Sequence, residues 1–199
     1  MPTARRAATV DLKDRAAADL QFIRETMNGA ASFTALSGVG YVLVGVGALV
    51  AGGVAGLLPG PAERVDVWLV DAALSVAIGF AFTARKARAA GQLLLSGPFR
   101  KFARSFSPAV IAGAVMTAWF VAEDAYQYLP ALWLLCYGAA LAAAGAFSVP
   151  VVPTMGASYL ALGVICAIAP RSWSEGFLLA GFGGLHIFFG ALIARRYGG

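Results

Sequence analysis

Apolar residues are gathered into six long stretches, and short segments rich in glycine, proline or charge separate them. Most stretches approach the ~20 residues that a helix needs to cross the hydrocarbon core of a bilayer, and shorter ones still span when flanking side chains reach toward the interface. The pattern therefore predicts six transmembrane helices, at residues 34–58, 67–84, 108–122, 129–147, 155–169 and 176–194. The predicted fold class is all-α and polytopic, with a cytoplasmic amphipathic segment at 1–33 before a six-helix transmembrane domain at 34–199.

The basic residues predict an orientation in the membrane. Apart from Arg64 and Arg171, every Lys and Arg lies before the first stretch, between the second and third, or after the sixth. Because cytoplasmic loops carry the excess of Lys and Arg, both termini are predicted to be cytoplasmic. Six of these residues are predicted to contact lipid phosphates of the anionic cytoplasmic leaflet: Arg85, Lys86, Arg88, Arg100, Lys101 and Arg104.

Composition narrows the class of protein further. The chain is 60% hydrophobic and 13% charged, against roughly 25% charged residues in soluble domains, which leaves room for little outside one membrane domain. The formal charge of +5 does not indicate nucleic acid as a partner, because the cations flank apolar stretches.

Cys136 and Cys166 lie inside apolar stretches without a CxxC pattern, so neither a disulfide framework nor a metal site is predicted. The first stretch is too long for the core of a signal peptide and is expected to remain as a helix.

Two segments have the pattern of amphipathic helices that lie on the membrane surface. In each, apolar positions recur at helical spacing beside charged ones: Leu20, Ile23 and Met27 in the first, Phe99, Phe102 and Phe106 in the second. Such segments are predicted to place an apolar face among the acyl chains on the cytoplasmic side. A docking surface for a cytoplasmic partner is the alternative.

A short motif occurs twice along the chain. The spacing of Gly38, Tyr41, Gly45 and Val46 is the same as that of Gly156, Tyr159, Gly163 and Val164. Both copies start from the predicted cytoplasmic side, and residues 81–86 and 191–196 end their helices alike. The repeat predicts three helical hairpins in parallel orientation, whereas a 3+3 inverted repeat would match the first helix to the fourth.

These hairpins, each with a glycine-rich helix, a proline-containing turn and a second glycine-bearing helix, resemble small six-helix bacterial membrane proteins of the HdeD type. The resemblance is closest over residues 156–169, Pro170 and residues 176–194, and the tail 183–199 is also similar to uncharacterised bacterial membrane proteins. The HdeD-type resemblance implies an inner-membrane role linked to acid or envelope stress. It supplies no catalytic motif.

His186 is the first candidate for chemistry. It is the only histidine, and counting ~1.5 Å per residue from either end of the sixth stretch places it near the bilayer centre. Gly183 and Gly190 lie at i−3 and i+4, so this face is predicted to pack against another helix. A neutral imidazole hydrogen-bonded across helices would fix their register; the alternative is a proton relay, a ligand site or a haem ligand. A single histidine without companion ligands does not predict a metal or cofactor.

Asp71 is the second candidate, because it is the only acid well inside an apolar stretch. Ser75, Gly79 and Thr83 follow it at successive i+4 positions. The stripe must face the protein or a water-filled crevice, since a carboxylate facing lipid costs roughly 2.5 to 3.5 kcal/mol. Two interpretations are open: an ion pair with an arginine of an outer loop, or a site for a cation or proton. A shared cavity with His186 would make a two-step relay.

Small residues and aromatic residues within the stretches complete the candidates. Close helix packing, within the chain or between copies in a homo-oligomer, is predicted at positions spaced four apart and beside His186: Gly52, Gly56, Gly176, Ala180, Gly183, Gly184 and Gly190. The aromatic residues Tyr41, Tyr137, Tyr159 and Trp119 are predicted to fill the core, with a pocket lining as the alternative.

The sequence as a whole predicts a structural or regulatory membrane protein. It contains no Walker motif, nucleophile elbow, HExxH or CxxCH pattern, so no enzyme activity and no cofactor are predicted. The lipid bilayer is the expected partner, together with further copies of the chain in the oligomeric alternative. The competing hypothesis is a transporter or channel for a small solute or proton that uses Asp71 and His186, with Ser75 and Thr83 beside them.

Overall fold

The computed structural model describes residues 15, 17–23, 33–91 and 96–198, which belong to two units, Met1–Ser32 and Phe33–Gly199. In the first unit residues 17–23 are helical, and Leu20 and Ile23 are exposed. Met27, the third apolar position of the predicted surface helix, lies outside the described residues. The placement of this helix on the membrane surface therefore stays a prediction.

The second unit is built from helices. Among the described residues, six helical stretches are long and apolar enough to cross a membrane, which confirms the predicted helical fold and its six apolar helices. They are α2 (Gly38–Ala55), α3 (Pro61–Ala89), α4 (Gly97–Ala122), η1 (Tyr126–Tyr128) with α5 (Leu129–Gly145), α6 (Val151–Ile168), and a last span of η2 (Arg171–Trp173), α7 (Ser174–Leu178), η3 (Leu179–Leu185) and α8 (His186–Tyr197).

Capping residues and prolines explain where several helices begin. The Ser37 side chain accepts a hydrogen bond from the Gly40 N–H at 3.2 Å and so caps α2. Proline lies in the first turn of α3, α4 and α5, where its missing N–H has no helical partner to lose. Because Pro98 provides this start for α4, the helix begins well before residue 108, where apolar composition alone placed it.

The residues predicted to form a second surface helix are the first turns of α4. Phe102 is buried, and its ring lies 5.5 Å from Phe33 and 5.8 Å from Phe106, measured between centroids. Phe106 in turn lies 6.0 Å from Tyr137 of α5. The phenylalanine face that was expected to enter the lipid therefore packs on the protein, and the chain continues into the span without a break.

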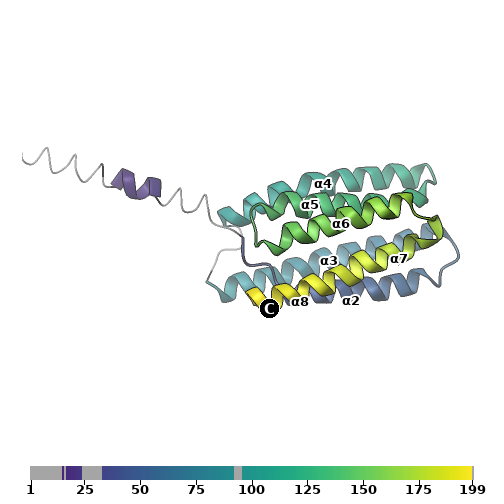
Figure 1. Ribbon diagram of the computed structural model, residues 1–199, viewed down its shortest axis with the longest axis horizontal. Helices are drawn as coiled ribbons and strands as arrows, with labels where there is room; N and C mark the ends of the chain where they lie inside the picture. The colour runs from purple at the N-terminus through teal and green to yellow at the C-terminus, as the bar shows by residue number, and fades with distance from the viewer. Residues whose placement is uncertain (1–14, 16, 24–32, 92–95, 199) are drawn as a thin grey trace, which may run out of the picture. The chain divides into compact units, whose positions relative to one another are not determined.

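The six spans form two groups of three. α2 packs against α3 on one side and against η3 and α8 on the other, while α5 packs against α4 and α6. Figure 1 shows the groups as two layers, with α4, α5 and α6 in one and α2, α3, α7 and α8 in the other. The predicted third hairpin joins α6 to the last span, but the last span packs more extensively on α2 than on α6. The three-hairpin repeat therefore stays a prediction.

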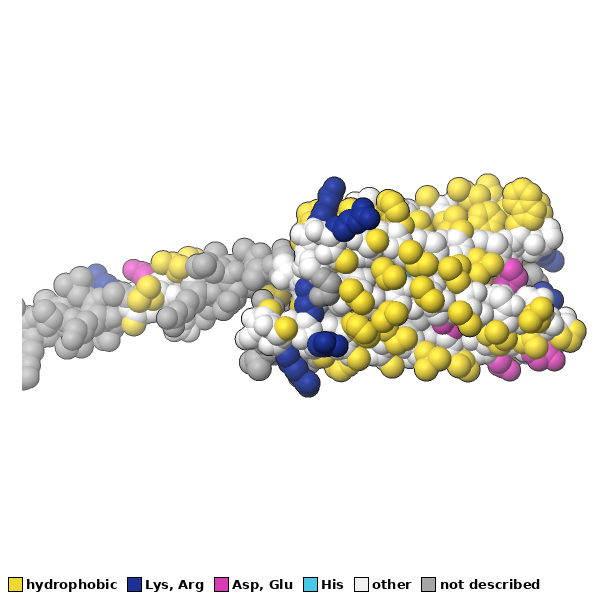
Figure 2. Space-filling view, turned by 90° about the horizontal axis from the view of Figure 1, so that it is seen from below, with side chains coloured by type: hydrophobic (Ala, Val, Ile, Leu, Met, Phe, Trp, Pro, Cys, Tyr) yellow, Lys and Arg dark blue, Asp and Glu magenta, His cyan; other side chains and the backbone are white. Residues whose placement is uncertain are grey.

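The surface of the bundle is divided along its length. On the face seen in Figure 2, Lys and Arg side chains gather at one end of the second unit, acidic side chains lie mostly toward the other, and apolar side chains cover the flank between them. α3 and α4 are the least buried spans. An apolar flank between two charged ends is the surface that a bilayer requires.

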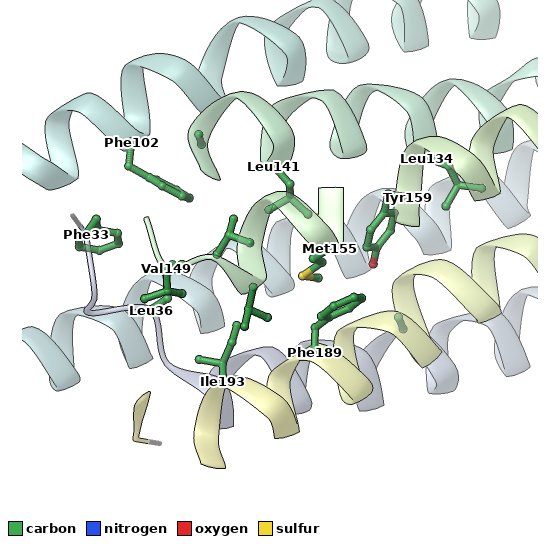
Figure 3. Close-up of a cluster of buried hydrophobic side chains, with 14 of the residues drawn as sticks. Phe33, Leu36, Phe102, Leu134, Leu141, Val149, Met155, Tyr159, Phe189 and Ile193 are labelled. Atoms are coloured by element: carbon green, nitrogen blue, oxygen red, sulfur yellow. The ribbon is translucent and has the colours of Figure 1, made fainter. Parts of the chain in front are cut away.

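The core lies between the two layers. Figure 3 shows Leu134 and Leu141 from α5, Met155 and Tyr159 from α6 and Ile193 from α8 meeting there, and all five side chains are fully buried. At one end of the bundle the segment before α2 pairs with the connection between α5 and α6. The Phe33 N–H donates to the Phe147 carbonyl at 2.7 Å, and the Ser148 hydroxyl donates to the Phe33 carbonyl at 2.9 Å.

Candidate functional site

The last span changes helix type just before its histidine. Residues Leu179–Leu185 form a π-helix, and α8 begins at His186. A side chain added at Gly181 would meet Leu134 of α5, and one added at Gly183 would meet Leu49 of α2. These glycines therefore let the segment approach both groups of helices. Single π turns inside α-helices are frequent at functional sites.

His186 is buried and hydrogen-bonded on both ring nitrogens. Its side chain is 3% exposed. Nε2 lies 2.8 Å from the hydroxyl oxygen of Tyr137, and Nδ1 lies 2.6 Å from that of Tyr159. Nδ1 also lies 3.0 Å from the carbonyl oxygen of Phe182, one turn earlier. The ring thus joins the last span to α5 and α6.

The acceptors around the ring determine which nitrogen carries hydrogen. Tyr159 donates its one hydroxyl hydrogen to the Gly181 carbonyl at 2.6 Å, so it has none to give to Nδ1. The Phe182 carbonyl is also only an acceptor. Nδ1 must therefore be the donor, and Nε2 accepts the hydroxyl hydrogen of Tyr137. In this neutral form, both nitrogens have a suitable partner.

A cage of aromatic rings surrounds the imidazole. The ring centroids of Tyr137, Tyr41, Tyr159 and Phe182 lie 5.3, 5.6, 5.7 and 6.1 Å from that of His186. These rings come from α2, α5, α6 and η3, so each group of three helices contributes. The cage excludes water from the imidazole and fixes its orientation by contact on several sides.

The repeated motif places its tyrosines at this site. Tyr41 and Tyr159 occupy the same position in the two copies and reach His186 from α2 and α6. The first glycine of each copy also has the same role. A Cβ on Gly38 would lie 2.5 Å from the Gly190 carbonyl oxygen, and one on Gly156 would lie 2.9 Å from the Gly138 carbonyl oxygen. Each copy therefore combines a close helix contact with a tyrosine directed at the histidine.

Asp71 lies elsewhere in the bundle. It is half-buried on α3, and a Cβ on Gly47 of α2 would lie 3.2 Å from its Oδ1. Gly45, two residues earlier on α2, instead contacts the Gly183 carbonyl and Ile187 of the last span. α2 therefore lies between Asp71 and the span that carries His186, and the structure does not bring the two residues together. Among the described residues, Asp71 forms no ion pair with either outer-loop arginine.

The polar stripe that follows Asp71 is only partly covered. Ser75 is half-buried and Thr83 is buried. A Cβ on Gly79 would have no described atom within 4 Å. The stripe begins and ends against the protein, but at Gly79 no described atom covers it.

The predicted packing positions fall into two sets. Gly52, Gly183 and Gly190 lie at close contacts between α2 and the last span, where added side chains would meet Leu179, Leu49 and Tyr41. Gly56 closes α2, Ala180 and Gly184 are exposed, and a Cβ on Gly176 would have no described atom within 4 Å. These four positions do not pack closely on another described helix, and contact between copies, the other part of the prediction, stays open for them.

The six basic residues predicted to contact lipid phosphates differ in their surroundings. Arg85, Arg88, Arg100 and Arg104 are exposed and Lys101 is half-buried. Lys86 instead donates from Nζ to three carbonyl oxygens, those of Leu36 at 2.9 Å, Tyr197 at 2.8 Å and Gly198 at 2.7 Å. It therefore ties the start of α2 to the end of α8, where the carbonyls of a helix attract a cation. The predicted headgroup contact does not describe this lysine.

The described side chains offer no evident metal centre. Among residues 15, 17–23, 33–91 and 96–198, no group of three or more His, Cys, Asp and Glu side chains is placed to hold a metal ion. Cys136 and Cys166 are free thiols, and a Cβ on Gly113 would lie 3.4 Å from the Cys136 sulfur. Cys136 thus fills a contact between α4 and α5.

Comparison of the chain with protein-family models, with curated proteins and with solved structures found no match. The HdeD-type resemblance accordingly stays a prediction, and the function has to be argued from the geometry.

The sequence did not predict that Tyr137 and Tyr159 are the partners of His186. It placed both tyrosines only in the core or along a pocket. Two features of the sequence could have indicated that these tyrosines contact the histidine. One is the glycines at 181, 183 and 184 directly before it, and the other is the equal position of Tyr41 and Tyr159 in the repeat.

Proposed function

We propose that this chain is a small structural or regulatory membrane protein in which His186 holds the bundle together. The supporting observation is that the partners of both ring nitrogens are protein atoms, in a side chain that is 3% exposed. A proton relay needs a group that can exchange hydrogen-bond partners with water or with the next carrier. His186 has no free nitrogen for such an exchange.

The finer features of the proposal rest on separate observations. Cations gathered at one end of the bundle support cytoplasmic termini, and the placement in a bacterial inner membrane rests on the HdeD-type resemblance. Gly38 and Gly156 make similar close helix contacts, and Tyr41 and Tyr159 both lie beside His186, which supports three hairpins related by duplication. A link to envelope stress rests on the HdeD-type resemblance alone. The proposal assigns no enzymatic step.

The lipid bilayer is the partner that this proposal requires. The exposed arginines 85, 88, 100 and 104 would contact phosphates of the anionic leaflet. A homo-oligomer would use the exposed small residues of the last span, which the chain itself does not cover.

The competing function, a carrier of protons or small cations, is favoured by one observation. Asp71 places a half-buried carboxylate against the backbone of α2, within a span. Such a group is costly to keep in a membrane unless it is paired or used. In this alternative Asp71 would act without His186, because α2 lies between them.

Proton flux separates the two functions. We expect liposomes that contain the wild type, Asp71→Asn or His186→Ala to show only the flux of protein-free liposomes when a pH gradient is applied and an internal pH dye is followed. Asp66→Asn, at an exposed acid on the same helix, is the matched control. A wild-type flux that Asp71→Asn abolishes and Asp66→Asn preserves would contradict the structural role and establish the carrier.

A further inference from the structure

A cavity of about 310 Å³ opens at the end of the bundle where α3 begins and α4 ends. Five apolar side chains form part of its wall: Val65 and Trp68 come from α3, Leu129 and Trp133 from α5, and Leu178 from α7. All except Trp133 are buried. Pockets for small molecules cover about 300 to 1,000 Å³, so this one suits a small ligand with an apolar part.

Four charged side chains line the same cavity: Arg64, Arg171, Asp124 and Glu175. Three of them are held by neutral neighbours. The Arg64 Nε donates to the Leu58 carbonyl at 2.8 Å, and the Trp68 Nε1 donates to Glu175 Oε2 at 3.1 Å. The guanidinium of Arg171 lies 5.9 Å from the centroid of the Tyr128 ring. These contacts position the charges without neutralising them.

The opposite charges of the cavity do not pair with each other. Among the described residues, no ion pair joins either arginine to either carboxylate, although all four side chains line one space. A simple anion bound there would meet two carboxylates, and a simple cation would meet two guanidinium groups. A ligand that carries both charges would satisfy both sets, because guanidinium groups bind phosphate or carboxylate and indole faces with carboxylates attract ammonium.

The end of α4 places the Asp124 carboxylate at the rim of the cavity. The φ of Asp124 is +52°, a left-handed conformation at the end of α4. The Ala125 N–H bonds to the Phe120 carbonyl and the Asp124 N–H to the Val121 carbonyl, the pattern in which glycine is the usual residue. Glycine would adopt this positive φ without steric cost, whereas aspartate also adds a carboxylate to the rim of the cavity.

We propose that this cavity binds a small zwitterion: a molecule with an ammonium group and a phosphate or carboxylate group a few bonds apart, on an apolar body that lies against Trp68 and Trp133. Two sources share this chemistry, the headgroup of phosphatidylethanolamine in the surrounding bilayer and a soluble zwitterion on the same side of the membrane. The proposal does not depend on His186 or Asp71, so it stands apart from the function proposed above.

Tryptophan fluorescence tests the proposal, since two of the four tryptophans line the cavity. Trp119 and Trp173, which are exposed and lie outside the lining, are replaced by phenylalanine to remove background. The full chain is placed in nanodiscs of phosphatidylglycerol. Glycerophosphoethanolamine is the soluble probe, phosphatidylethanolamine added to the disc is the lipid probe, and ethanolamine and glycerol phosphate are single-charge controls. We expect a saturable change with a zwitterionic probe and none with either single-charge control.

Charge-removing variants with matched controls show where the probe binds. Glu175→Gln keeps an oxygen that accepts the Trp68 N–H, so the wall stays intact while the charge is lost. We expect Glu175→Gln and Arg171→Gln each to weaken binding by about tenfold, as expected for loss of a charge-assisted contact. The controls are Glu123→Gln, next to Asp124 but outside the lining, and Arg195→Gln on α8. They should change binding by less than about twofold, as surface charges do.

Each outcome bears on the proposal. Saturation by the lipid probe alone identifies the headgroup as the source, saturation by the soluble probe alone identifies a soluble ligand, and both results support a zwitterion site. The proposal is overturned by an equal response to ethanolamine or glycerol phosphate, by no saturable response to any probe, or by controls that weaken binding as much as Glu175→Gln.

Discussion

Replacing Gly38 with alanine is expected to lower the free energy of unfolding by about 3 kcal/mol, or to prevent folding. The added Cβ would lie 2.5 Å from the Gly190 carbonyl oxygen and 2.6 Å from the Ala194 Cα. Both are main-chain atoms, so relief requires α2 and α8 to move apart along their contact. Inserting atoms into such a contact costs typically 1 to 3 kcal/mol, and more where nothing can yield. In this contact two backbones face each other.

Unfolding by SDS in mixed micelles, followed by near-UV circular dichroism, measures this loss. Gly156→Ala should behave similarly, because its Cβ would lie 2.5 Å from the Ala142 main-chain nitrogen in the other group of helices. Gly79→Ala on α3 is the matched control, with no described atom within 4 Å of the added Cβ, and should change stability by no more than about 1 kcal/mol. A comparable loss for Gly79→Ala would show that the helix contact is not the cause.

Replacing Lys86 with methionine is expected to cost about 2 kcal/mol. Methionine keeps most of the length of the side chain but leaves the Leu36, Tyr197 and Gly198 carbonyls without their common donor. Hydrogen bonds to a charged group contribute roughly 1.5 to 3 kcal/mol each. Water at the open end of α8 replaces part of this set, so the expected loss is near that of one such bond.

The same SDS titration measures the effect of Lys86→Met. Arg85→Met is the control, since Arg85 is the preceding residue on α3 and is exposed. We expect the Arg85 variant to remain within about 0.5 kcal/mol of the wild type. Equal losses for the two variants would mean that Lys86 contributes only as one of the surface cations.

The apolar pattern was enough to predict the spans, because hydrophobic length is a local property of the sequence. The six predicted stretches overlap the six helical spans, and the absence of bulk at Gly183 and Gly190 correctly placed the His186 face against a helix. Helix ends were less accurate. α4 begins at Gly97, because Pro98 and the phenylalanines that follow continue the helix into a mixed polar segment.

What the sequence could not predict depends on contacts between distant residues. Residue types alone did not show which small residues of the last span face another helix: a Cβ would meet Leu49 at Gly183 but no described atom within 4 Å at Gly176. The partners of Lys86 are main-chain atoms about fifty and over one hundred residues away. Every residue has a backbone carbonyl, so the residue types do not show which carbonyls accept from Lys86. The charged cavity is lined by three segments that are distant in the sequence, within residues 61–68, 124–133 and 171–178.

The nitrogen spectrum of His186 tests the account most directly. Histidine occurs once in the chain, so the full-length protein grown with ¹⁵N-labelled histidine and placed in bilayers gives signals from this ring alone. We predict a neutral ring with hydrogen on Nδ1, a bare Nε2, and an Nδ1–H signal that persists after transfer to deuterated water. A neutral ring with its hydrogen on Nε2 would contradict the hydrogen-bond directions given above, whereas a doubly protonated ring or rapid loss of the signal would show that a proton or water reaches His186. That result would contradict its role as a sealed link between helices.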